Sequence, residues 1–172
     1  MNYMAGLTWT RQPGVRFLYH PSAQMTMGVS FENPDQYIGG SGGGSTVVLP
    51  SALSTLPGSQ LDNASNVQTI PNAQPDIIAK IAFDPSRKAH IEVAGIQRTF
   101  KVWNPLITAH STKMGGGGSV NANVEVVKNF RLVSNNYWSD GGGRYLFGQA
   151  PDVVVRADGS VSPIHSGGTV DG

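Results

Sequence analysis

The residues best suited to chemistry in this sequence are four histidines, His20, His90, His110 and His165. They lie far apart in the chain, none stands at the spacing of a metal site, and there is no cysteine to complete one. The segment HSGG at 165–168 lacks the G-x-S-x-G pattern of a nucleophile elbow. The sequence therefore predicts no catalytic residue and no metal site.

Two glycine-rich runs are the next candidates, since such loops can hold phosphate groups. GGSGGGST at 39–46 lacks the lysine of a P-loop, and GGGGSV at 115–120 leads into a predicted strand instead of a helix. We therefore interpret both runs as flexible surface loops and expect no nucleotide or other cofactor.

Polar side chains that alternate with apolar ones are the dominant pattern of the chain. In KAHIEVAG at 88–95, His90 and Glu92 alternate with Ile91 and Val93, and SAQMTMGVSFENP at 22–34 repeats the pattern. Successive side chains of a strand point to opposite faces, so these segments predict strands with one apolar and one polar face. A slip in the alternation after Val93 predicts a bulge or a close backbone approach near Gly95 and leaves the face of Arg98 undecided.

The sequence predicts an all-β fold, because no sustained helical period is present in the chain. Seven strands are expected, at 14–19, 23–32, 76–83, 88–102, 119–127, 130–139 and 151–157. The strand at 130–139 is the weakest, since Ser134 and Asn136 interrupt the apolar set of Phe130, Leu132 and Trp138. We assign no strand to the last residues, HSGGTVDG.

The connections between these strands alternate between short and long. Short turns at 20–23, 84–87 and 128–129 are separated by long connections at 33–75, 103–118 and 140–150. Loops longer than about 15 residues are uncommon in compact domains. An antiparallel up-and-down meander with short turns at one end and long loops at the other is typical of transmembrane β-barrels, and strands of about ten residues match their apolar band.

Composition agrees with this prediction and excludes other classes. The net charge is +1, which gives no reason to expect a nucleic-acid partner, and only 13% of residues are charged, against about 25% in an average soluble domain. No apolar run is long enough for a membrane-spanning helix.

Three segments resemble the bacterial outer-membrane porins, especially the DcaP-like group: FLYHPSAQMTMGVSFENP, PDIIAKIAFDPSRKAHIEVAGIQRTF and NNYWSDGGGRYLFGQAPDVVVRADGS. The resemblance implies a trimeric, water-filled channel in the bacterial outer membrane for passive diffusion of small hydrophilic solutes. The sequence departs from this family by having no signal-peptide pattern, too few strands and no C-terminal strand that ends in an aromatic residue. We therefore expect residues 1–172 to form a single partial barrel.

The alternation assigns residues to the two sides of such a wall. The predicted pore-lining residues are Arg16, Lys80, His90, Glu92, Asn121, Asn123, Glu125 and Arg131. The predicted lipid-facing residues are Met25, Met27, Val29, Phe31, Ala89, Ile91, Val93, Val120, Ala122, Val124 and Val126.

One alternative stays open at this point. A secreted or cell-surface β-sandwich would show the same alternation with the apolar face turned inward, and could bind a ligand such as a carbohydrate through its long loops. No motif supports an enzyme.

Overall fold

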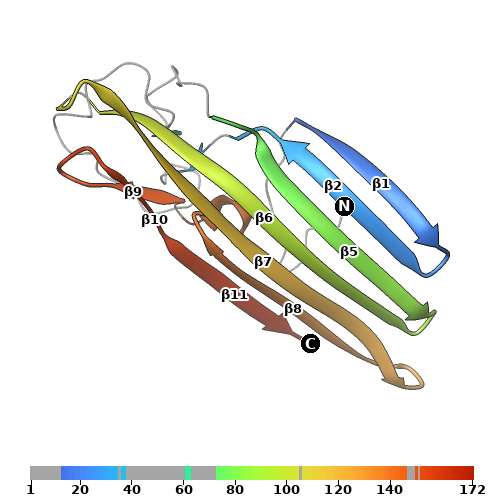
Figure 1. The fold of residues 1–172 in the computed structure, drawn as a ribbon. Coiled ribbons are helices and arrows are strands. Elements are labelled where there is room, and N and C mark those ends of the chain that lie inside the picture. The colour runs from blue at the N-terminus through green and yellow to red at the C-terminus, as the bar shows by residue number, and fades with distance from the viewer. Residues whose placement is uncertain are drawn as a thin grey trace.

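The computed structural model describes residues 13–34, 36–37, 61–62, 73–104, 106–146, 150 and 152–172 (Figure 1). Seven strands form one antiparallel sheet in the order β1–β2–β5–β6–β7–β8–β11. Their bounds are β1 Gly14–Ser22, β2 Met25–Glu32, β5 Asp76–Ser86, β6 Ala89–Asn104, β7 Ala109–Val127, β8 Phe130–Asp140 and β11 His165–Asp171. The described part of the chain is thus all-β, as predicted.

The smaller elements lie in the connections of this sheet. β3 (Gln36–Tyr37) pairs in parallel with β4 (Leu61–Asp62) between β2 and β5. A short 3-10 turn, η1 (Gly143–Tyr145), follows β8, and a hairpin of β9 (Val153–Val155) and β10 (Val161–Pro163) precedes β11.

The three tight turns lie together at one end of the sheet, and the strand ends that the longer connections join lie at the other (Figure 1). Each tight turn joins an antiparallel pair whose register shifts close to the turn, between Tyr19 and Ser22 in the first pair. Asn129, in the β7–β8 turn, has a φ of 66°, a conformation that asparagine tolerates better than most residues.

The connection between β6 and β7 is shorter than predicted. β7 begins at Ala109, not at 119, so the connection spans 105–108 and the glycines at 115–118 lie inside the strand. A side chain at Gly115 would collide with the Phe100 ring and the Asp140 carbonyl oxygen. The glycines therefore permit close packing here, and the interpretation of this run as a loop was wrong.

Two further predictions need correction, one within β6 and one in the chain that follows β8. The register of β6 is continuous through Gly95 on both neighbouring strands, so no bulge occurs there. The strand expected at 151–157 is only the short β9, and the seventh strand of the sheet is β11, in the segment where none was assigned. β11 carries no clear alternation of its own, and its pairing with β8 defines it.

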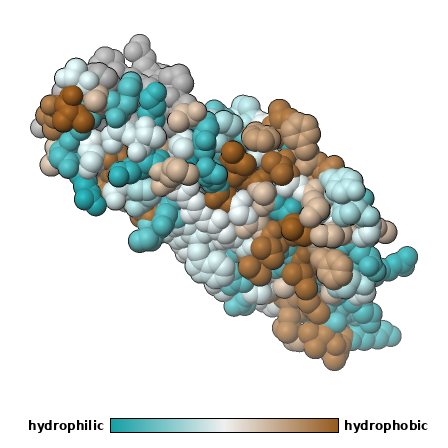
Figure 2. Space-filling model, viewed as in Figure 1, coloured by the Kyte–Doolittle hydropathy of each residue, from teal (hydrophilic) through white to brown (hydrophobic). Residues whose placement is uncertain are grey.

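The sheet has an apolar face and a polar face. Large side chains of the apolar face are exposed, among them Phe17 at 63% and Val93 at 51%. Figure 2 shows hydrophobic residues gathered mainly toward the tight turns and hydrophilic ones toward the long connections. Among the described residues no second sheet covers the apolar face, which disfavours a sandwich.

Most of the buried residues lie instead where the β8–β11 connection folds against the polar face. Phe100 and Val153 are fully buried, and Val161 and Tyr145 are nearly so. This small core lies at the end of the sheet that carries the long connections.

Candidate functional site

The strand register places all eight predicted pore-lining residues on the polar face. Glu92 lies opposite Asn121, His90 opposite Asn123, and Glu125 opposite Arg131. Ten of the eleven residues predicted to face lipid share the apolar face, and the eleventh, Val126, lies at the register shift between Glu125 and Val127, where no strand pair assigns its face. That the polar face meets water and the apolar face meets lipid remains a prediction.

Charged side chains on the open part of the polar face form local pairs. The Lys80 Nζ lies 2.6 Å from the Glu92 Oε2, and the His90 Nδ1 lies 2.7 Å from the Asp84 Oδ1. The Arg131 guanidinium donates to the Asn123 side-chain oxygen at 3.0 Å. These side chains remain partly exposed, and exposed pairs of this kind contribute about 0–1 kcal/mol to stability.

Arg98 forms a different kind of pair, because its side chain is fully buried. Its Nε donates to the Asp76 Oδ2 at 2.9 Å, and its Nη1 lies 2.8 Å from the Asp152 Oδ1. The same Nη1 donates to the Gly141 carbonyl oxygen at 2.5 Å. The planar guanidinium offers several donors in a fixed fork, so one side chain joins β5, β6 and the β8–β11 connection.

Aromatic rings enclose this arginine. The guanidinium carbon lies 5.1 Å from the centre of the Phe100 ring and 5.2 Å from that of Tyr145, within the range of cation–π attraction. The Tyr145 hydroxyl donates to the Asp76 Oδ2 at 2.9 Å. We call Asp76, Arg98, Phe100, Tyr145 and Asp152 the buried cluster.

The buried cluster fastens the described part of residues 141–164, which we call the docked segment, to the polar face. Further bonds support it: the Tyr137 hydroxyl donates to the Gly142 carbonyl oxygen at 3.1 Å, and the Asn104 amide donates to the Asp158 carbonyl oxygen at 2.7 Å. Gly142 packs so closely that an added Cβ would collide with the Tyr137 hydroxyl. The docked segment is therefore held at several points.

The turn at the tip of the docked segment is closed by its own residues. The backbone N–H and the hydroxyl of Ser160 both donate to the Asp158 carboxylate, which lowers the pKa of Asp158 below its usual value. Gly159 has a φ of 76°, which favours glycine.

Beside the docked segment, the polar face is hollowed into a groove of about 340 Å³. Its lining includes Arg16, Lys80, Glu92, Asn121 and Tyr145, four of which the sequence predicted as pore-lining. Arg16 has no ion-pair partner among the described residues. The groove thus offers charges of both signs to a solute.

The sequence analysis missed the buried cluster. Asp76 and Tyr145 received no role, and Arg98 was left without a face. The observed register places Arg98 on the same polar face as Glu92, farther along β6. Asp152 and Tyr145 reach Arg98 only through the fold of the β8–β11 connection.

Other kinds of site were also sought in the described residues. They contain no group of three histidine, aspartate or glutamate side chains that could hold a metal ion. They contain no helix of the length and apolarity needed to cross a membrane.

Comparison with known proteins gives a likeness in structure. No family model and no curated protein matches the sequence. A crystal structure of the outer membrane channel DcaP of Acinetobacter baumannii matches with a TM-score of 0.68 over 95% of this chain, at 18% identity. This chain covers 39% of that channel's chain.

At this identity the match shows the fold. The seven-stranded open sheet is an antiparallel up-and-down meander with the fold of part of an outer-membrane barrel, as the porin resemblance implied.

Proposed function

We propose that this chain forms part of the wall of an outer-membrane channel for passive diffusion of small hydrophilic solutes. In this arrangement the polar face lines a water-filled lumen and the apolar face meets outer-membrane lipid. The likeness to an outer membrane channel supports the proposal at the level of the fold.

The observation that carries the proposal is the opposition of the two faces. Side chains such as Phe17 and Val93 are more than half exposed, while charged side chains occupy the reverse of the same strands. A single sheet with this division is unfavourable in water, since its apolar face stays hydrated, but suits a boundary between lipid and water.

The docked segment supports a role in limiting solute size. It lies against the polar face, where a lumen would be, and the buried cluster holds it there. A segment fixed inside the lumen narrows the passage at that level. Solutes would pass the adjoining groove, where Arg16, Lys80 and Glu92 bias the passage of ions without excluding either sign.

Closure of the barrel needs strands beyond the seven of this sheet. The outer edges of β1 and β11 have no strand partner among the described residues, and unpaired backbone groups are costly in hydrocarbon. The channel we propose is therefore the complete barrel, and the trimeric state that the porin resemblance implies belongs to that barrel.

Conductance in planar bilayers tests this function. We would purify the protein from outer membranes, record single-channel currents, and measure reversal potentials for Arg16→Glu and for a matched control, Lys128→Glu in the β7–β8 turn. We expect channels in all samples and a shift toward cation selectivity with Arg16→Glu alone. A protein that is soluble without detergent and forms no channels would contradict the proposal and favour the alternative of a ligand-binding β-sandwich.

A further inference from the structure

The groove beside the docked segment contains apolar side chains on a face that is otherwise polar. Ile78 of β5 lies directly opposite Ile96 of β6, and Ala94 lies opposite Lys80 in the same strand pair. These side chains border the groove and are partly exposed. We call Ile78, Ala94 and Ile96 the apolar strip. In a water-filled lumen such side chains stay hydrated unless a solute covers them, so covering them is favourable.

Charged residues flank the apolar strip at both of its ends. On the side of the long connections it adjoins the buried cluster, because Arg98 follows Ile96 by two residues on the same face of β6. Tyr145 of the docked segment borders the groove at this end. On the side of the tight turns the strip adjoins the ion pair of Lys80 and Glu92. The strip therefore lies between the docked segment and a partly exposed ion pair, on strands that have neighbours on both sides.

The Lys80–Glu92 pair can exchange partners with a solute. The Lys80 Nζ lies 2.6 Å from the Glu92 Oε2, and in the described part of the chain neither side chain forms another ion pair. Opening a pair that is partly exposed costs little. A solute anion that binds Lys80 leaves Glu92 without a cation, and a solute cation that binds Glu92 leaves Lys80 without an anion. A solute that carries both charges close together gives each side chain a new partner.

We propose that this groove binds small zwitterions that carry an ammonium and a carboxylate group on one carbon atom together with an apolar side chain, the chemistry of an apolar α-amino acid. The solute carboxylate accepts from the Lys80 ammonium, and the solute ammonium donates to the Glu92 carboxylate. The apolar side chain of the solute covers Ile78 and Ile96. The inference rests on the proposed function, since the groove meets diffusing solutes only where the polar face lines a lumen.

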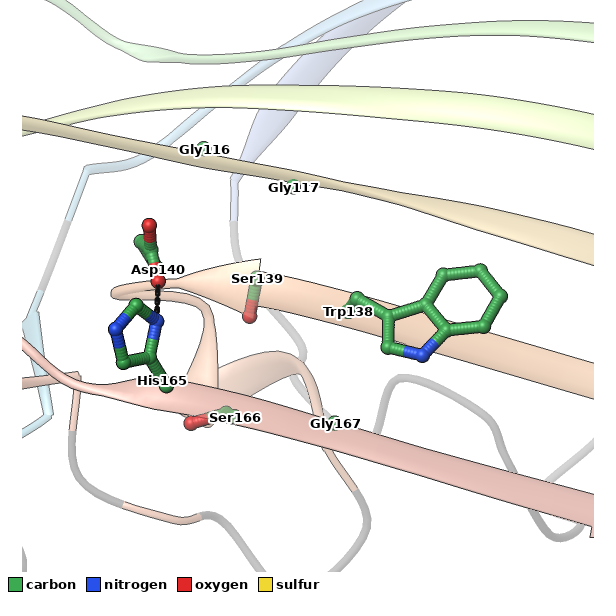
Figure 3. A pocket seen from close by; sticks show the side chains of 8 residues that line it. All are labelled: Gly116, Gly117, Trp138, Ser139, Asp140, His165, Ser166 and Gly167. Carbon is green, nitrogen blue, oxygen red and sulfur yellow. Dashed lines mark ion pairs between the residues drawn. The ribbon is translucent and has the colours of Figure 1, made fainter.

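A second groove, of about 520 Å³, lacks this combination of features (Figure 3). It lies on the reverse face of the sheet, where Asp140 and His165 form an ion pair at one end and Trp138 lies at the other. Glycines of β7 and β11 contribute to its lining. In the proposed channel this face meets lipid, so the second groove receives no diffusing solute. Its carboxylate therefore provides a matched control for the loss of Glu92.

Uptake into lipid vesicles tests the inference with four probes. L-Leucine carries all three features, whereas 4-methylpentanoate lacks the ammonium group, 3-methylbutylamine lacks the carboxylate, and L-serine lacks the apolar side chain. We would reconstitute the protein purified from outer membranes and measure initial uptake rates against probe concentration, with protein-free vesicles subtracted. We expect L-leucine uptake to saturate, with half-saturation at a concentration about tenfold lower than for any other probe. Uptake of L-leucine that does not saturate, or another probe that saturates at an equal or lower concentration, would overturn the inference.

Two variants assign the binding to this groove. Glu92→Gln should raise the half-saturating concentration of L-leucine about tenfold, because the solute ammonium loses its charged partner, with Asp140→Asn as the control. Ile96→Ser should raise it in the same direction, with Val133→Ser as the control, since Val133 shares the polar face but lies outside the groove. Variants that bind L-leucine as tightly as their controls would overturn the inference.

Single-channel conductance of the same preparations separates the two proposals and shows that each variant has folded. Channels that conduct ions but do not retain L-leucine overturn this inference alone. The absence of channels in the unmodified protein overturns the proposed function. The comparison of the four probes uses the unmodified protein, so it decides the inference even where a variant fails to fold.

Discussion

Two ion pairs on the polar face have similar lengths and opposite environments. The Lys80–Glu92 pair is 2.6 Å long, and its side chains are 35% and 21% exposed. Arg98 lies 2.9 Å from Asp76, and both side chains are fully buried. A buried charge has lost its hydration, so it depends on its partners far more than an exposed one does. The difference indicates that the Lys80–Glu92 pair contributes charge to the groove, whereas the Arg98–Asp76 pair holds the fold of the docked segment.

The largest expected effect comes from removing the buried guanidinium of Arg98. Arg98→Ala leaves Asp76 and Asp152 buried without their cation, and breaking a buried pair costs about 3–5 kcal/mol. We expect a large fall in thermal stability, measured as a lower temperature at which the gel mobility of the folded protein changes to that of the unfolded protein. The docked segment should also loosen, which would raise single-channel conductance. Unchanged stability and conductance would show that the buried cluster does not hold the docked segment.

The next largest effect should be the difference in stability between a charge added to the apolar face and a charge added to the polar face. Met27→Lys places a charge on the apolar face and should cost about 2–4 kcal/mol near the membrane centre, whereas the neighbouring Thr26→Lys lies on the polar face and should be tolerated. Folding into detergent micelles or lipid vesicles, titrated with urea, measures both free energies. Equal costs for the two variants would contradict the assignment of the faces.

A smaller effect is expected where the docked segment meets the wall. Gly142→Ala adds a Cβ that collides with the Tyr137 hydroxyl, and overpacking of this kind costs about 1–3 kcal/mol. Gly168→Ala, where the added Cβ meets only the Leu146 side chain at 3.9 Å, is the control. Higher conductance with Gly142→Ala, and not with the control, would show that the contact positions the segment.

The smallest effect should come from the exposed pair. Lys80→Met removes a cation that remains partly in contact with solvent, so the loss of stability should stay below about 1 kcal/mol. Ion selectivity should nevertheless shift toward cations, because Glu92 then lies in the groove without its nearest partner. Reversal potentials and unfolding titrations on the same sample would check both parts of this prediction.

The sequence by itself determined the elements whose signal is local. Alternation between neighbouring residues was enough to predict β2, β5 and most of β6, and to sort residues such as Glu92 and Val93 onto opposite faces. The alternation of short and long connections also predicted which ends of the strands lie together. These features depend on side chains two residues apart and on the length of a turn, so they can be read from the chain directly.

The tertiary structure decided the features that depend on distant residues. The glycines at 115–118 were interpreted as a loop, although they lie within β7. At Gly115, Gly116 and Gly117 the neighbouring strands leave no room for a side chain, which only the folded sheet reveals. β11 has a weak pattern and exists through its pairing with β8. Arg98 meets Asp76, 22 residues away, and Gly141, 43 residues away, and no local period reports such contacts. The alternation fixes which face a residue occupies, but only the folded chain determines what it meets there.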